Sequence, residues 1–216
     1  LTARRAVTAL LVPGAGAGPR VPVRAEGDSA DLDRDAAGTP GRLRLAGRPA
    51  RIDVPPEADS GSRRATAEVF EVAFAGGRPS RANVPVPLSL LETAPRRAEG
   101  AERGAARLVT AGSGQLVFAG DGSTIETAVL EGGVAASEGS TASIRAPRAT
   151  LRGEDQSAVF TGTVTDPARY VDPDARVSAT VLTWFRKDAR IEGAGNVKTS
   201  FRGREVPEVL TRGNHR

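Results

Sequence analysis

Few residues in this sequence could perform acid–base or metal chemistry, and none of them is grouped as a catalytic site requires. The one histidine, His215, lies in a polar stretch beside the C-terminus, and there is no second His and no Cys to share a metal with it. Two acidic pairs, Glu154/Asp155 and Asp172/Asp174, fall among turn-forming residues, where carboxylates usually stabilise the turn. We therefore predict no catalytic residue, no metal site, no cofactor, and a protein that is not an enzyme.

Apolar residues, in contrast, recur with a spacing that predicts stacked β-hairpins. The pattern Ala-x-x-Φ-x-Φ (Φ is apolar) occurs four times, and a valine closes each unit 17, 23, 18 and 18 residues after its alanine. The copies are Ala67-Phe70-Val72, Ala111-Gly114-Leu116, Ala146-Ala149-Leu151 and Ala179-Leu182-Trp184, closed by Val84, Val134, Val164 and Val197. The second copy is the weakest, because glycine takes an apolar position. Each unit can form two strands and a turn but cannot bury its own apolar face, so neighbouring units must stack.

The spacing inside the repeat also predicts that the strands bend. Side chains on one face of a strand are two or four residues apart, whereas the alanine and the first Φ are three apart. A strand that keeps both residues on the same core must bulge or turn a corner between them. Pro147 and Gly112-Ser113 lie in this gap in two copies, as expected for a bulge. We therefore expect an all-β fold: a bent, partly open β-jelly roll, or folded-over sheet, built of hairpin repeats.

Composition divides the chain into three parts. Residues 1–41 are rich in Gly, Pro, Ala and charge without a sustained period, and we expect a loose segment or linker there. Residues 42–201 carry the strand patterns and form the expected β domain, with 95–107 as an insertion loop. Residues 202–216 are a polar tail.

The basic charge of the chain invites a nucleic-acid function, which its distribution weakens. The formal net charge is +4, but residues 107–201 hold 10 basic and 11 acidic residues, so the repeat region is nearly neutral. A nucleic-acid domain clusters cations on one face with aromatic residues among them. We expect no specific binding of nucleic acid.

The repeats resemble a known family. Their arrangement, "A-x-x-Φ-x-Φ, turn, Φ-x-G-x-V", is similar to the OstA-like repeats of the periplasmic lipopolysaccharide-transport proteins (LptA, LptC and the N-terminal part of LptD). The best match is 177–201, whose ending Ala194-Gly195-Asn196-Val197 has the commonest form of the family's repeat terminus, and 143–164 is a second good match. The resemblance covers roughly 43–201, and it departs from the family at the 95–107 insertion and at the second repeat.

This resemblance implies a carrier or bridge module that shields the acyl chains of lipopolysaccharide during export to the outer membrane of Gram-negative bacteria. It implies a periplasmic location and pairing with other jelly-roll export components through open sheet edges. It implies membrane association only through an N-terminal anchor that the given sequence would lack. An LptA-like role and an LptC-like role both remain open.

The residues expected to line a lipid groove are the large apolar members of the repeats and of the strands that return beside them. They are Phe70, Val72, Leu116, Phe118, Leu151, Phe160, Leu182 and Trp184. The same residues could instead form the closed core of a structural β-repeat module, for example a surface or adhesin segment, that binds no ligand. The two functions differ in whether one side of the apolar interior is open.

Overall fold

The structure is a computed structural model of the 216-residue chain. It describes residues 2–11, 23–56, 61–93, 106–120, 122, 124–153, 157–185, 188 and 190–202. Within these ranges the protein is all-β and has no helix, which confirms the expected fold class at that level. The alternating apolar and polar residues explain this result, because each strand can bury one face and leave the other in water.

The described residues form sixteen strands in one sheet. The strands of the N-terminal half are β1 (Thr2–Leu11), β2 (Val23–Arg34), β3 (Pro40–Val54), β4 (Arg63–Ala75), β5 (Arg78–Val84), β6 (Leu88–Glu92), β7 (Arg107–Ala111) and β8 (Ser113–Phe118). Those of the C-terminal half are β9 (Ile125–Glu138), β10 (Ala142–Arg152), β11 (Ser157–Thr161), β12 (Ala168–Val171), β13 (Ala175–Ala179), β14 (Val181–Phe185), β15 (Arg190–Ala194) and β16 (Lys198–Phe201).

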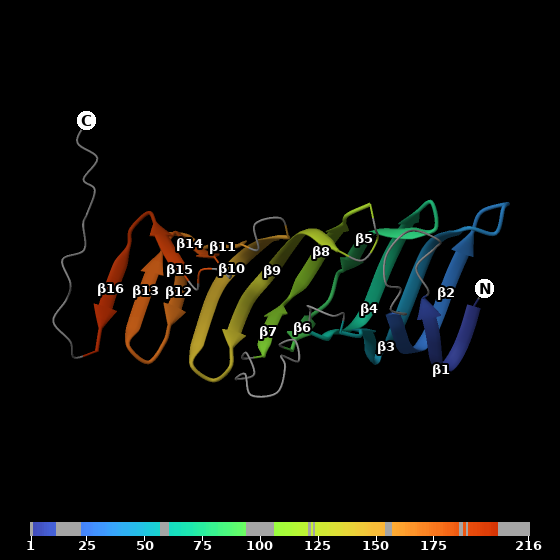
Figure 1. The fold of residues 1–216 in the computed structure, drawn as a ribbon, viewed down its shortest axis with the longest axis horizontal. Helices are drawn as coiled ribbons and strands as arrows, with labels where there is room; N and C mark the ends of the chain where they lie inside the picture. Colours follow the sequence, from blue (N-terminus) through green and yellow to red (C-terminus); the bar gives the residue numbers. More distant parts are fainter. Residues whose placement is uncertain are drawn as a thin grey trace.

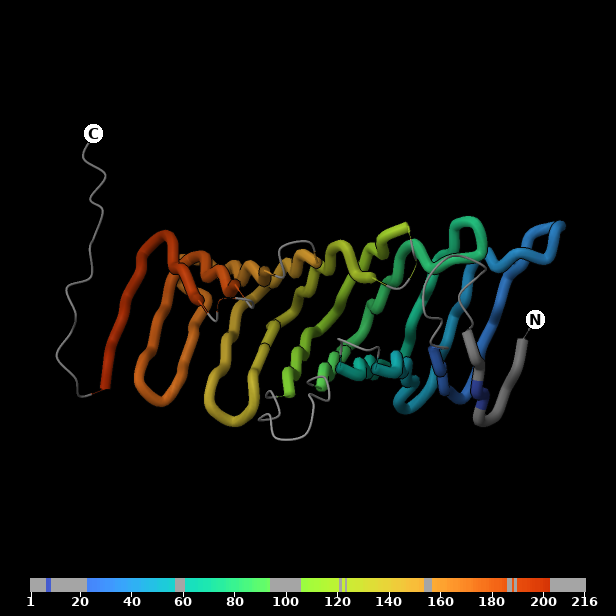
Figure 2. Tube along the Cα trace, in the orientation of Figure 1, coloured from blue at the N-terminus to red at the C-terminus, as the bar shows by residue number. Residues whose placement is uncertain are grey.

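Every pairing in the sheet is antiparallel, and the chain advances along the long axis of the molecule from β1 to β16 (Figure 1). The colours of the chain trace run in order from one end of the molecule to the other (Figure 2). Each segment therefore packs mainly on segments close to it in sequence, as in other repeat proteins, although pairs such as β5–β8 and β11–β14 skip intervening strands.

The sheet is folded into two layers, because its strands pass from one layer to the other in mid-course. One half of β4 pairs with β5 and the other half with β6; β9 is shared in the same way by β8 and β7, and β10 by β11 and β12. The first layer contains β5, β8, β11, β14 and β15, and the second contains β6, β7, β12, β13 and β16. Because β4 and β9 run through both layers, the pairings β4–β5–β8–β9–β7–β6 close into a ring of six strands.

The bend falls where the repeat predicts it. The register shifts between Ala146 and Arg148 at Pro147, and a break in the strand separates β7 from β8 at Gly112 and β13 from β14 at Thr180. The bend in β4 lies opposite the register shift between Ala46 and Ala50 of β3. The expected corner between the alanine and the first Φ is therefore confirmed.

Packing over the bend explains the glycine in the second repeat. A Cβ atom at Gly114 would lie 3.0 Å from Leu130 Cδ2 and 3.2 Å from Leu88 Cδ2. These two leucines fill the space that an apolar side chain occupies in the other repeats. Gly112 at the same bend is restricted as well, because a Cβ there would lie 2.8 Å from the carbonyl oxygen of Gly132.

One sequence-based expectation needs correction. The segment expected to be loose up to residue 41 contains β1 and β2, and β2 pairs with both β1 and β3, so the sheet extends well before residue 42. Of the closing valines, Val84 and Val134 are buried, but Val164 is 73% and Val197 48% exposed, because they lie in the connections at the bend. Most of the expected insertion loop (residues 94–105) and the tail beyond residue 202 lie outside the described residues.

Candidate functional site

The eight predicted groove residues all lie in the first layer and on its inner face. The register aligns Phe70, Phe160 and Leu182 in a row beside the bend, which we call the first bend row. Val72, Leu116, Leu151 and Trp184 lie in the next row outward, the first outer row, and Phe118 lies one step beyond it. The stacking of the repeats therefore brings the predicted residues together on one surface, because cross-strand pairing in register puts equivalent positions side by side.

The alanines of the repeat form the matching row of the second layer. Ala50, Ala67, Leu88, Ala111, Val134, Ala146, Ala168 and Ala179 are in register, and we call them the second bend row. All eight are buried. Small side chains suit this row because the two layers converge at the bend and leave little space between them. Sequence analysis placed the repeat alanines on the same core as the Φ residues but did not include them among the residues expected to line the groove.

The rows farther from the bend are unevenly buried: Val72, Leu116 and Ile144 are buried there, whereas other apolar side chains are partly exposed. In the first bend row, Leu182 is 0% and Phe160 2% exposed. In the outer rows, several large residues are only partly buried, although they pack on the same cluster: Leu151, Trp184 and Ile191 in the first layer, and Ile52, Leu90, Val109 and Val177 in the second. The interior is therefore sealed along the bend and partly accessible along the opposite side, which we call the rim.

A ladder of alternating charges marks the rim of the second layer. Arg63 pairs with Glu92 (N–O distance 3.5 Å), and Arg107 pairs with Glu138 (2.9 Å). The register places the four residues in line across β4, β6, β7 and β9. They alternate in step with the inner apolar residues of the same strands, so they lie on the inner face. The Arg107 guanidinium also lies 6.0 Å from the ring centroid of Trp184 in the opposite layer, within cation–π range. A polar margin thus borders the apolar interior.

Tyr170 and Asp172 continue this margin at β12. The Tyr170 hydroxyl donates a hydrogen bond of 2.7 Å to Asp172 Oδ2. Burial, this hydrogen bond to a carboxylate and the nearby charge of Glu138 together raise the pKa of Tyr170, so the phenol remains neutral. Burial opposes ionisation of Asp172, but hydrogen bonds from Tyr170 and from the Ala175 and Asp174 amides lower its pKa overall. This pair fixes the ring on the inner face and supplies no acid–base group near neutral pH.

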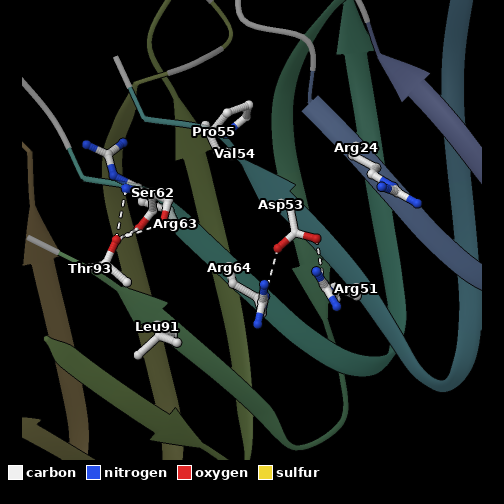
Figure 3. Close-up of a pocket in the computed structure, with 10 residues that line it drawn as sticks. All are labelled: Arg24, Arg51, Asp53, Val54, Pro55, Ser62, Arg63, Arg64, Leu91 and Thr93. Atoms are coloured by element: carbon white, nitrogen blue, oxygen red, sulfur yellow. Dashed lines mark hydrogen bonds and ion pairs between the residues drawn. The ribbon is translucent and has the colours of Figure 1, made fainter. Parts of the chain in front are cut away.

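A hollow lies at the N-terminal end of the second layer, and its charges neutralise one another (Figure 3). The Asp53 carboxylate lies between Arg51 (2.5 Å) and Arg64 (2.7 Å), and Arg24 pairs with Glu26. Burial alone would raise the pKa of Asp53, but hydrogen bonds from the two arginines lower it overall. Arg24, Arg51 and Arg64 therefore serve as partners in structural ion pairs.

A second hollow lies on the outer face of β12, β13 and β16 and has a different character. Arg169, Arg176 and Lys198 line it together with Ser178 and Ser200. None of these three cations takes part in an ion pair with another described residue. Sequence reasoning missed this cluster because net charge was summed along the chain. The sequence could have revealed the cluster, because each cation is adjacent in its strand to an inward-facing residue. Side chains alternate along a strand, so all of these cations face outward.

Among the described residues there is no group of three or more His, Cys, Asp or Glu side chains that could hold a metal ion. Over the same part of the chain, no helix is long and apolar enough to cross a membrane.

No protein-family model matches this chain, and no curated protein matches it. The fold and the surfaces described above therefore carry the functional argument, together with the residues of the repeat.

Proposed function

We propose that this protein is a periplasmic carrier or bridge module that shields lipid acyl chains in its apolar interior, as the resemblance to the lipopolysaccharide-transport repeats implies. The finer fold proposed with it is a partly open β-jelly roll. The observation that carries the proposal is that the bend rows are buried throughout, whereas each outer row contains large apolar side chains that are only partly buried.

The energetics of acyl-chain transfer favour such an interior. Each methylene exposed to water costs about 0.8 kcal/mol, so a twelve-carbon chain costs roughly 10 kcal/mol. Two facing apolar layers remove much of this cost, while an accessible rim leaves the polar head group in water. The charged residues of the rim, Arg63, Glu92, Arg107 and Glu138, are compatible with that head group remaining outside.

The ends of the sheet support a role in a bridge. β15 pairs only with β14, and β16 only with β13, so each leaves one edge without a partner among the described strands. Every described side chain of β16 is exposed. Unpaired backbone N–H and C=O groups on such an edge can accept a strand from another jelly-roll component of the export machine.

Site-specific photo-crosslinking to lipopolysaccharide tests the proposal. A photoreactive residue at position 151, 182 or 184 should label the lipid, because these side chains face the interior. Matched controls are positions 150 and 183, which lie on the same two strands and face outward. Labelling should be several-fold stronger from the inner positions.

Equal labelling from both faces, or none from any inner position of the folded protein, would contradict the carrier function. The second candidate, a structural β-repeat module without a ligand, would then be preferred. One observation favours that candidate: Arg107 contacts Trp184 across the rim and so partly closes it.

A further inference from the structure

From β7 to β16, two adjacent rows on the outer face of the second layer carry positive charge and no negative charge. The register aligns Thr110, Ala135, Arg145, Arg169, Ser178 and Lys198 in one row, and Leu108, Ser137, Ser143, Val171, Arg176 and Ser200 in the next. All twelve residues are described, and the four cations among them are exposed. We call Arg145, Arg169, Arg176 and Lys198 the basic patch.

The arrangement of the basic patch works against the stability of the free protein. Arg145 and Arg169 are directly opposite each other on β10 and β12, a placement that is destabilising for like charges. No carboxylate of the described residues forms an ion pair with any cation of the patch. At the other end of the same layer, Asp53 and Glu26 neutralise the arginines around them. The described residues therefore supply no counter-charge to the patch.

We propose that the basic patch docks this face of the protein on an anionic phospholipid surface. The patch lies on the outer face of an open sheet, and its hollow is shallow, so it fits an extended surface of phosphate groups. Val171 and Leu108 are exposed in the same rows (40% and 39%) and can contact the interfacial region of the lipid. The inference is independent of what the interior binds, because the patch is on the opposite face of the second layer.

A nucleic acid fits these observations less well. Proteins that bind single strands stack the bases on aromatic side chains, and neither outer row contains an aromatic residue. Tyr170, the aromatic residue nearest the patch in sequence, is on the inner face and is hydrogen-bonded to Asp172. Proteins that recognise duplex DNA by its sequence place a helix or a β-ribbon in a groove, whereas this face is a continuous sheet.

Co-sedimentation of the full chain with vesicles tests the proposal. Each cation near an anionic surface strengthens binding roughly fivefold, so vesicles that contain phosphatidylglycerol should bind the protein at low salt and release it at high salt. Vesicles of phosphatidylcholine alone should not bind it. The double variant Arg169→Glu/Lys198→Glu should reduce binding by at least tenfold.

The matched control is Arg81→Glu/Arg152→Glu, which changes the net charge equally on the outer face of the first layer. Both arginines are exposed and have neutral cross-strand neighbours. This variant should keep most of the binding.

The single variant Arg169→Glu adds a readout that a general charge effect would not give. It should raise the melting temperature, because it places a carboxylate opposite Arg145, while it weakens binding to the vesicles.

Three results would overturn the proposal: equal loss of binding in the two double variants, equal binding to neutral vesicles, or a fall in the melting temperature of Arg169→Glu. Duplex DNA that binds through the same residues at physiological salt would assign the patch to nucleic acid instead. Competition by inorganic phosphate at low concentration would assign it to a discrete phosphate group.

Discussion

Trp184 is the residue at which the interior, the rim and the opposite layer meet. Its ring lies in the first outer row, is partly buried against the core cluster, and has the guanidinium of Arg107 6.0 Å from its centroid. It is also the one tryptophan of the chain, so its fluorescence reports on this position alone.

The emission of Trp184 should shift to shorter wavelength when a lipid with long acyl chains is added, because the chain displaces water from the partly exposed indole. The measurement is a fluorescence titration with lipopolysaccharide, and the control is a soluble oligosaccharide without acyl chains. If the emission stays unchanged at lipid concentrations that give crosslinking at position 182, the acyl chains do not reach Trp184.

Asp53 makes the ion pairs with Arg51 and Arg64 dependent on pH. Its folded-state pKa is below the ordinary value of 3.8, so its contribution to stability is present above that pH and is lost as the pH falls through the folded-state pKa. Asp53→Asn should lower the free energy of unfolding at neutral pH by about 0.2–1 kcal/mol, the range for exposed pairs. Urea denaturation as a function of pH tests this, and the difference from the wild type should vanish in acid. A difference that persists there would assign the effect to packing.

The bend is the feature of the strands that creates an interior. In each repeat the alanine lies on one side of the bend and the two Φ residues on the other, so each repeat lines both layers, whether its strand is continuous or broken at the bend. The alanine row sets how closely the layers approach, and the larger Φ residues fill the space where they diverge.

Replacement of Ala146 by leucine should therefore destabilise the fold by about 1–3 kcal/mol, the usual cost of overpacking a dense core. Ala146 is 6% exposed and belongs to the second bend row. The control is Ala135→Leu on the outer face of β9, which should change the free energy of unfolding by less than about 0.5 kcal/mol. Denaturant unfolding measures both variants. Equal effects would mean that the layers can separate at the bend.

The described part of the molecule is a two-layered array, and β15 and β16 each leave one edge without a partner among the described strands. Each segment pairs mainly with segments close to it in sequence, and β15 and β16 end the described part of the two layers. The array can be extended by another chain without a change in its own pairing, which is the basis of the proposed bridge.

Proline substitutions in β16 test whether this end pairs with another chain. In an antiparallel strand, neighbouring N–H groups point to opposite sides, so one of Thr199→Pro and Ser200→Pro removes a bond to β13 and the other removes an N–H from the free edge. The variant that removes a hydrogen bond to β13 should lower the melting temperature. The variant that removes an N–H from the free edge should leave the melting temperature nearly unchanged and abolish end-to-end self-association, measured by sedimentation. A wild-type chain that stays monomeric at high concentration would contradict edge pairing between copies.

The sequence by itself determined the strands and the bend, because both depend on local spacing. The period of two predicts strands, and the three-residue gap from Ala146 to Ala149 forces the corner that the register shift at Pro147 shows. The eight predicted interior residues lie on one surface for the same reason, since equivalent positions of stacked repeats align. Strand β2 (residues 23–34) was not predicted from the sequence, because Ala25 and Ala30 bury little apolar area and give a weak pattern. Pairing with β3 nevertheless buries both residues.

The tertiary structure alone decided which charges stand together. Glu92 and Arg107 are close only because β6 pairs with β7, and Arg107 reaches Trp184 only because the sheet folds over. The basic patch is invisible in a charge sum over 107–201, since the acids that balance it lie in turns and on other faces. Electrostatic interactions depend on distance in space, and the chain fixes that distance only after its strands have paired.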